Sequence, residues 1–176
     1  MSQGCMPLLG WCFLMMGLVF YDSVHGNTRQ VAEAIAEQIK ADGHQARIIN
    51  LSSDSACTMQ GDFMFIGSPT RYSTMTGHVK KFIKRLDQSI WGDKPICAFE
   101  TYGPVEEGKV VASKTNEKWI TSGASKKILD MLKDRGFNIR APTLRLAVTG
   151  LKGPLASGQI EEAKKYTHEF IDSIGG

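Results

Sequence analysis

Residues 17–28 read Gly-Leu-Val-Phe-Tyr-Asp-Ser-Val-His-Gly-Asn-Thr, and the pattern they begin repeats along the whole chain. Residues 17–21 form a short apolar run, which is typical of a strand buried on both faces of a sheet. A polar segment, 22–28, follows, and an amphipathic pattern then predicts a helix over 28–41, ended by Gly43. A buried strand, a short polar loop and a helix together form the repeating unit of α/β folds.

The same alternation continues toward the C-terminus. Further apolar runs predict strands at residues 46–51, 63–66, 95–99 and 144–148. Amphipathic patterns predict helices at 77–86, 125–135 and 157–174. Residues 52–62 have little helical pattern, so we expect a helix there to be short or missing. Five buried strands with intervening helices predict a doubly wound α/β sandwich around a parallel sheet.

Length and composition restrict the class of protein. The chain has 176 residues, of which 42% are hydrophobic and 22% are charged, so we expect one globular domain rather than a disordered, fibrous or disulfide-stapled chain. The net charge of +3 is too small to indicate nucleic-acid binding, which needs a concentrated basic face. The densest basic run, residues 78–85, has apolar residues at helical spacing and is interpreted as a solvated helix face.

The cysteines indicate no metal site. Cys5, Cys12, Cys57 and Cys97 form no CxxC pair, and their spacing matches no zinc or haem pattern. Cys97 lies in an apolar run and is predicted to be a core residue. We expect reduced thiols and a cytoplasmic protein.

The N-terminal region has an unusual apolar character. Residues 6–21 are almost continuously apolar, but no Lys or Arg precedes them and no small-x-small cleavage site follows, so a signal peptide is not indicated. The stretch is also short for a membrane span. We expect a hydrophobic extension, residues 1–14, ahead of one domain, residues 15–176. An upstream start codon and a real extension that packs on the surface or mediates association both fit this pattern.

Three distinctive loops follow predicted strands, and the carboxyl ends of parallel strands meet at one edge of a sheet. The first loop carries Ser23, Asn27 and Thr28, and Gly26 permits close approach of the backbone. With the free N–H groups of the helix start, they predict an anion site suited to a terminal monophosphate. No Lys follows the glycine and no G-x-G-x-x-G is present, so neither a nucleoside-triphosphate loop nor a dinucleotide fingerprint is indicated. Simple helix capping is the alternative.

The other two loops suit a flat ligand. Residues 67–77 are polar and stiffened by Pro69, so this loop could lie along the edge of a ring. Residues 100–104 place Tyr102 beside Gly103, and an aromatic side chain at a strand end can stack on a planar group. A plain surface loop and an ordinary turn tyrosine are the alternatives. The segment 101–123, which contains Trp119, is long for this fold class.

The segments 19–28, 31–36, 67–72 and 101–103 resemble the flavodoxin family, and the resemblance extends from residue 16 to the C-terminus. It implies a flavodoxin-like three-layer sandwich, with a five-stranded parallel sheet in the order 2-1-3-4-5 and helices on both faces. It also implies one noncovalent flavin mononucleotide (FMN). By resemblance, the phosphate would be bound by Ser23, Val24, His25, Gly26, Asn27 and Thr28. The ring would be flanked by Ser68, Pro69, Thr70, Arg71, Tyr72, Ser73, Thr74, Met75, Thr101, Tyr102 and Gly103.

The sequence departs from the family in three places. His25 stands where many flavodoxins have a hydroxyl residue, and it could face the phosphate or the solvent. The chain is mildly basic, whereas flavodoxins that carry electrons are typically strongly acidic. Residues 69–72, followed by Met75, are similar to the corresponding loop of WrbA-type NAD(P)H:quinone oxidoreductases, which share the fold and FMN.

The resemblance implies two functions. We expect a small electron-transfer protein that works between redox partners, a reductase and an electron acceptor, with no nucleic acid partner and no membrane span. The alternative is an FMN-dependent NAD(P)H:quinone oxidoreductase, in which Lys109, Lys114, Lys118 and Trp119 could wall the site. The oligomeric state stays open. A third class, a domain that keeps only an anion site, is disfavoured because receiver domains need clustered acidic residues after strand one.

Overall fold

The computed structural model describes residues 14–53, 59–103 and 123–175. In chain order the elements are β1 (Met16–Tyr21), α1 (Asn27–Ala41), β2 (Gln45–Asn50), β3 (Phe63–Pro69), α2 (Gly77–Arg85), α3 (Gln88–Trp91), β4 (Ile96–Tyr102), α5 (Ala124–Asp134), β5 (Ile139–Ala147) and α6 (Gln159–Ile174). The strands form one five-stranded sheet in the order β2-β1-β3-β4-β5, and every neighbouring pair is parallel. The predicted sheet order is confirmed.

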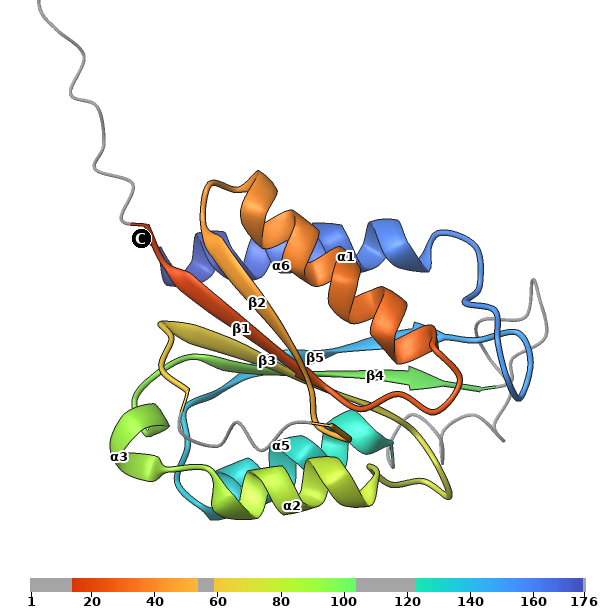
Figure 1. Ribbon diagram of the computed structural model, residues 1–176, viewed down its shortest axis with the longest axis horizontal. Coiled ribbons are helices and arrows are strands. Elements are labelled where there is room, and N and C mark those ends of the chain that lie inside the picture. The colour runs from red at the N-terminus through yellow and green to blue at the C-terminus, as the bar shows by residue number, and fades with distance from the viewer. Residues whose placement is uncertain (1–13, 54–58, 104–122, 176) are drawn as a thin grey trace, which may run out of the picture.

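Helices cover both faces of the sheet and complete three layers. Figure 1 shows α1 and α6 on one face and α2, α3 and α5 on the other. Successive side chains of a strand point to opposite faces of the sheet, so one strand contributes residues to the hydrophobic core on each face. In β1, Leu18 and Phe20 join the core under α2 and α5, while Val19 and Tyr21 join the core under α1 and α6. Burial on both faces explains why the central strands are continuous apolar runs.

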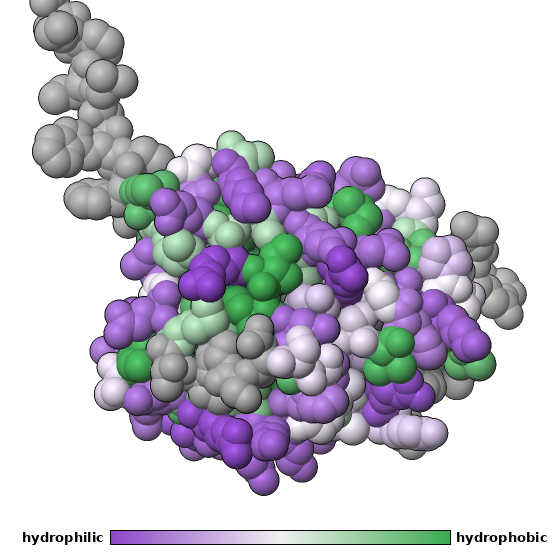
Figure 2. Space-filling model, in the orientation of Figure 1, coloured by the Kyte–Doolittle hydropathy of each residue, from purple (hydrophilic) through white to green (hydrophobic). Residues whose placement is uncertain are grey.

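The helices bury the residues that their periodicity indicated. In α2, Val79, Phe82 and Ile83 are buried, while the lysines of the basic run 78–85 are exposed. The prediction of a solvated basic face is therefore confirmed. Figure 2 shows a largely hydrophilic exterior on one side of the molecule, with hydrophobic residues in small groups.

Four elements differ clearly from the sequence-based prediction. β3 and β4 continue to Pro69 and Tyr102, beyond their predicted ends at 66 and 99, so the first residues of the predicted loops 67–77 and 100–104 lie in strands. β5 begins at Ile139, five residues before the predicted start at 144, because Pro142 and polar neighbours interrupt its apolar run. Proline is tolerated there because β5 is an edge strand, and its pairing with β4 shifts register between Cys97 and Phe99. The short helix α3 was not predicted. Its start is capped by Asp87, whose carboxylate accepts the Ser89 N–H at 2.8 Å.

The remaining predictions on organisation have mixed outcomes. Cys97 is fully buried in the core, as predicted. Within the described ranges, no helix combines the length and the apolar character needed to cross a membrane. Residues 51–53 and 59–62 contain no helix, while 54–58 lie outside the described residues. Also outside them are Cys5, Cys12, Cys57, most of the predicted extension 1–14, and residues 104–122 with Trp119, so the division into 1–14 and 15–176 stays a prediction.

Candidate functional site

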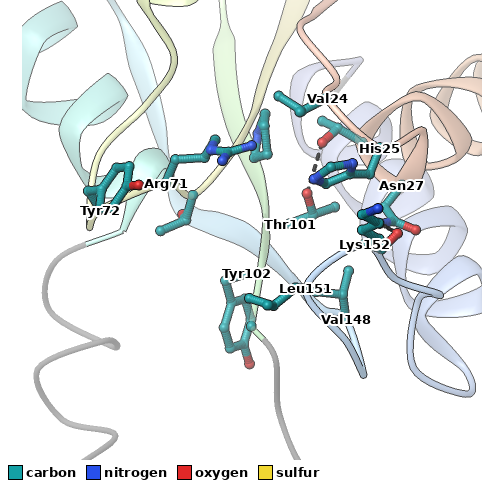
Figure 3. A pocket seen from close by; sticks show the side chains of 14 residues that line it. Val24, His25, Asn27, Arg71, Tyr72, Thr101, Tyr102, Val148, Leu151 and Lys152 are labelled. Atoms are coloured by element: carbon teal, nitrogen blue, oxygen red, sulfur yellow. Dashed lines mark hydrogen bonds between the residues drawn. The ribbon is translucent and has the colours of Figure 1, made fainter.

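A pocket of about 460 Å³ opens at the carboxyl edge of the sheet. Its volume lies within the range of small-molecule sites, roughly 300–1,000 Å³. Loops after β1, β3, β4 and β5 converge on it (Figure 3). It is lined by Val24, His25, Asn27, Thr28, Pro69, Thr70, Arg71, Tyr72, Thr101, Tyr102, Gly103, Val148, Leu151 and Lys152.

The loop between β1 and α1 presents the start of a helix to this pocket. Gly26 has φ +88° and is the N-cap of α1, so it provides no side chain to occupy the first-turn N–H groups. The Ser23 hydroxyl accepts the Gly26 N–H at 3.1 Å, and the Ser23 N–H donates to Asp22 at 2.9 Å. Ser23 and Gly26 therefore shape the loop without lining the pocket, and the helix N-terminus is left available for an anion.

The side chains of Asn27 and Thr28 bind other loops of the protein. Thr28 Oγ1 and Thr101 Oγ1 are 2.8 Å apart in a buried hydrogen bond. Asn27 Nδ2 donates to the Lys152 carbonyl at 3.0 Å, and a Cβ at Gly153 would overlap the Asn27 side chain. These contacts hold the β1, β4 and β5 loops together. The groups at this end that can still bind an anion are backbone N–H groups and nearby cations.

The loop after β3 is a tight hairpin. The Arg71 N–H donates to Thr74 O at 2.9 Å and the Thr74 N–H to Arg71 O at 3.0 Å, with φ +49° at Tyr72 and +61° at Ser73. Positive φ at both central residues is the pattern of a type I′ turn. Tyr72, at the tip, is 93% exposed.

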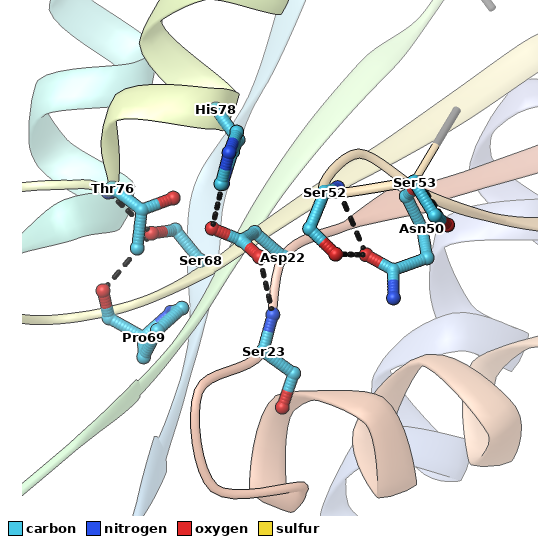
Figure 4. A network of polar contacts seen from close by, with 9 residues as sticks. All are labelled: Asp22, Ser23, Asn50, Ser52, Ser53, Ser68, Pro69, Thr76 and His78. Carbon is cyan, nitrogen blue, oxygen red and sulfur yellow. Dashed lines mark hydrogen bonds and ion pairs between the residues drawn. The ribbon is translucent and has the colours of Figure 1, made fainter. Parts of the chain in front are cut away.

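The predicted residues of this loop divide into two groups. Pro69, Thr70, Arg71 and Tyr72 line the pocket, whereas Ser68, Ser73, Thr74 and Met75 do not. Ser68 is fully buried, donates to the Pro69 carbonyl at 2.9 Å and accepts the Thr76 N–H at 3.0 Å (Figure 4). Ser68 therefore fixes the path of the loop.

The third predicted loop lies beside the start of the hairpin, and the Thr70 N–H donates to the Thr101 carbonyl at 2.8 Å. Thr101, Tyr102 and Gly103 all line the pocket, and Gly103 has φ +144°. The Arg145 guanidinium lies over the Tyr102 ring, 4.8 Å from its centroid. The segment that follows, with Lys109, Lys114, Lys118 and Trp119, lies outside the described residues, so the proposed wall is untested.

Sequence reasoning missed a fourth loop. Val148, Leu151 and Lys152 line the pocket from the segment after β5. Its sequence, Thr-Gly-Leu-Lys-Gly-Pro over 149–154, holds two glycines and a proline directly after a predicted strand. That signal marks it as a loop at the same sheet edge as the other three.

The pocket combines positive charge with apolar surface. Among the described residues, its ionisable lining residues are His25, Arg71, Lys152 and the two tyrosines, with no carboxylate. His25 is exposed at the surface and also lines the pocket. The nearby Asp22 is buried and accepts from Ser23, and its other oxygen lies 3.1 Å from His78 Nδ1 (Figure 4). The pocket thus suits a ligand with an anionic end and a flat apolar part.

Known proteins are similar to this chain in sequence. A family model described as a flavodoxin domain matches residues 18–120. A flavodoxin from Aquifex aeolicus (strain VF5) is 29% identical over 125 residues, 68% of this chain and 61% of that protein. The aligned region therefore spans less than two thirds of that relative's length.

Solved structures show the same fold. A flavodoxin from the domain Archaea superposes with a TM-score of 0.70 at 21% identity, covering 92% of this chain and 100% of that one. A flavodoxin, WrbA-like protein from Agrobacterium tumefaciens gives 0.59 at 18% identity, covering 90% and 96%. The sheet order, the loops at its carboxyl edge and the match over more than half of the sequence agree, and the chain belongs to the flavodoxin family.

Proposed function

We propose that the pocket binds FMN. The observation that carries this proposal is a helix N-terminus without a side-chain cap, joined to a largely apolar pocket whose described lining residues include Arg71 and Lys152 and no carboxylate. The phosphate would lie at the start of α1, where N–H groups and the helix dipole favour an anion. Bound FMN would supply the redox chemistry, and the protein would bind, orient and shield it.

The residues fall into direct and supporting roles. Val24, His25, Asn27 and Thr28 would surround the phosphate, with Lys152 as an added cation. Pro69 to Tyr72 and Thr101 to Gly103 would flank the ring. Ser23, Gly26, Ser68, Ser73, Thr74 and Met75 would shape these loops without lining the pocket.

We further propose that the protein carries electrons between redox partners. Among the described residues, the strongly exposed large hydrophobic side chains are Leu14, Val24, Ile48, Tyr72 and Leu151. Val24, Tyr72 and Leu151 all line the pocket, from three different loops. Their gathering at the mouth supports a surface where a partner protein docks beside the ring.

The alternative is an FMN-dependent NAD(P)H:quinone oxidoreductase. Arg71 favours it, because an exposed guanidinium beside the ring loop can bind a phosphate group of NAD(P)H. In that case hydride would pass from the nicotinamide to the flavin without any other protein.

One experiment separates these functions. FMN is added to the purified protein, excess is removed by desalting, and anaerobic visible spectra are recorded before and after NADH or NADPH. We expect a retained flavin spectrum that stays oxidised until dithionite or a separate reductase is added. Rapid bleaching by the nucleotide alone would favour the quinone reductase. Loss of all flavin on desalting would overturn both proposals.

A further inference from the structure

A buried carboxylate that does not line the pocket connects two of its loops. Glu100 is fully buried in β4, next to the pocket residues Thr101 and Tyr102. Burying a charge is costly unless it is paired and hydrogen-bonded. The hydrogen-bond and ion-pair partners of Glu100 therefore show which parts of the chain this side chain holds together.

The partners of Glu100 come from three other parts of the chain. Its Oε1 forms an ion pair with Arg145 Nε from β5. Its Oε2 accepts the Thr70 hydroxyl and, at 3.2 Å, the Ser125 N–H in the first turn of α5. Thr70 Oγ1 in turn accepts the Ala124 N–H at 2.9 Å. One carboxylate thus ties the loop after β3 to the start of α5 and to β5.

The backbone at Gly123 packs tightly against the Glu100 carboxylate. A Cβ at Gly123 would overlap it, so the chain approaches the carboxylate with a glycine. The start of α5 also directs the Ser125 N–H toward it.

Arg145 connects Glu100 to Tyr102, the last residue of β4. Its side chain is 21% exposed, and its guanidinium lies 4.8 Å from the centroid of the Tyr102 ring. A guanidinium stacked on a tyrosine restricts the orientation of that ring. Glu100 therefore contacts Thr70, after β3, directly and Tyr102, at the end of β4, through Arg145.

We propose that Glu100 and Arg145 are positioning residues for the flavin ring. The backbones of the two segments that hold Thr70 and Tyr102 are already joined by the Thr70 N–H, which donates to the Thr101 carbonyl at 2.8 Å. Glu100 and Arg145 fix the side chains of Thr70 and Tyr102 and so control the affinity of the ring-binding part of the pocket, although neither touches the ligand. The inference rests on the proposed FMN site. The phosphate end is held by other contacts, those of Asn27 with the Lys152 carbonyl and of Thr28 with Thr101.

The test separates ring binding from phosphate binding. Affinities for FMN and for riboflavin, which lacks the phosphate, are measured by fluorescence titration, and inorganic phosphate is used as a competitor of FMN. We expect Glu100→Gln and Arg145→Met to weaken FMN and riboflavin by the same factor, about tenfold for a lost charge-assisted contact. The inhibition constant of phosphate should stay unchanged. Lys164→Gln, which breaks the 3.0 Å surface pair with Glu37, is the matched control and should change neither affinity.

A second variant covers the case in which Glu100→Gln does not fold. Arg145→Lys keeps the charge opposite Glu100 but removes the flat guanidinium over Tyr102. We expect weaker riboflavin binding and an altered visible circular dichroism of the bound flavin. In a Tyr102→Leu background the same substitution should have no further effect, because Arg145 acts through that ring.

The outcomes distinguish the inference from the proposed function. Wild-type protein that binds neither flavin overturns the proposed function and this inference together. Wild-type protein that binds both, with unchanged affinities in the variants, overturns this inference alone. Equal weakening of riboflavin and phosphate, or additive losses in the Tyr102→Leu background, would indicate a general structural role and also overturn it.

Discussion

At the scale of single residues, the hydroxyl pair of Thr28 and Thr101 connects the two ends of the proposed site. Both side chains are almost fully buried, and their oxygens are 2.8 Å apart. Thr28→Val leaves the Thr101 hydroxyl without this partner at the pocket wall. We expect FMN affinity to fall about fivefold, the equivalent of ~1 kcal/mol for one lost hydrogen bond. Fluorescence titration measures the change.

Thr167→Val provides the matched control for this prediction. Thr167 is fully buried in α6 and donates to the Ala163 carbonyl at 2.7 Å, away from the pocket lining. It should lower the unfolding midpoint and leave FMN affinity unchanged. An equal loss of affinity in both variants would mean that Thr28 acts only through stability.

Cys97 gives a second prediction at this scale. Burial raises the pKa of its thiol to about 12, although a hydrogen-bond contact with Tyr166 Oη at 3.2 Å acts in the opposite direction. The thiolate is the reactive form, so we expect native Cys97 to be alkylated roughly a thousandfold more slowly than in unfolded protein. Mass spectrometry of the peptide containing Cys97, after iodoacetamide treatment with and without denaturant, measures this. Comparable labelling in both states would contradict the burial.

At the scale of elements, a histidine joins the two helices on one face of the sheet. His168 of α6 lies 3.0 Å from Asp42, which caps the end of α1, and 3.5 Å from Asp172. The hydrogen bond to Asp42 and the nearby carboxylates of Asp172, Asp42 and Glu169 raise the pKa of His168 above its ordinary value. Because the folded pKa is raised, this contribution to stability is fully present below the unfolded pKa and is lost as pH rises through the folded value.

We therefore expect His168→Gln to be pH-dependent in its effect. The difference in unfolding free energy between wild type and variant should be larger at about pH 5.5 than at about pH 8.5. Urea unfolding at the two pH values measures it. A difference of the same size at both values would show that the charged form of His168 makes no contact of consequence.

The hairpin after β3 allows a prediction about backbone conformation. Tyr72 and Ser73 both have positive φ, a region that is costly for side chains other than Asn, Asp and Gly. Replacing Tyr72-Ser73 by Asn-Gly should raise the unfolding free energy by about 1 kcal/mol, as measured by urea unfolding. The variant should also bind a redox partner less well, since it removes the 93% exposed aromatic side chain. No gain in stability would mean that other contacts already compensate for the turn.

Several elements could be predicted from the sequence, and the exceptions have physical reasons. Strands such as 63–66 are recognisable because both faces are buried, which leaves no polar residue in the run. The first half of β5 is not recognisable from the sequence, because it contains Pro142, and proline usually interrupts a strand that is not at a sheet edge. α3 is one turn long, too short for a hydrophobic period to show.

At the scale of the whole molecule, part of the candidate site could be predicted from the sequence and part could not. Three of its loops could be predicted because glycine and short polar residues follow apolar runs. Leu151 and Lys152 belong to a fourth loop with the same signal, which lies outside the segments that carry the family motifs. Glu100 and Arg145 could not be predicted, because two charges far apart in sequence indicate a buried pair only once the strands are placed side by side.

The distribution of charge over the molecule gives the last prediction. Arg71 and Lys152 line the pocket mouth, and none of the other described lining residues is a carboxylate, so an anionic oxidant should be attracted there. For chemically reduced FMN-loaded protein, oxidation by ferricyanide should slow as salt rises, because screening shortens the reach of these charges from about 30 Å at 0.01 M to about 8 Å at 0.15 M. Stopped-flow absorbance at several ionic strengths measures the rate.

Charge-matched variants show whether this effect is local. Arg71→Gln and Lys152→Gln should each slow ferricyanide oxidation at low salt and speed oxidation by hexaamminecobalt(III), a cation, because each removes a positive charge from the mouth. Lys133→Gln is the control, because it makes the same change in net charge in the last turn of α5. The first turn of α5, at the other end of the helix, contacts Thr70 beside the pocket. Because α5 leads away from the carboxyl edge, this control should have little effect. If all three variants changed the rates equally, net charge alone would govern the reaction, and the basic mouth would give no preference for an acidic partner.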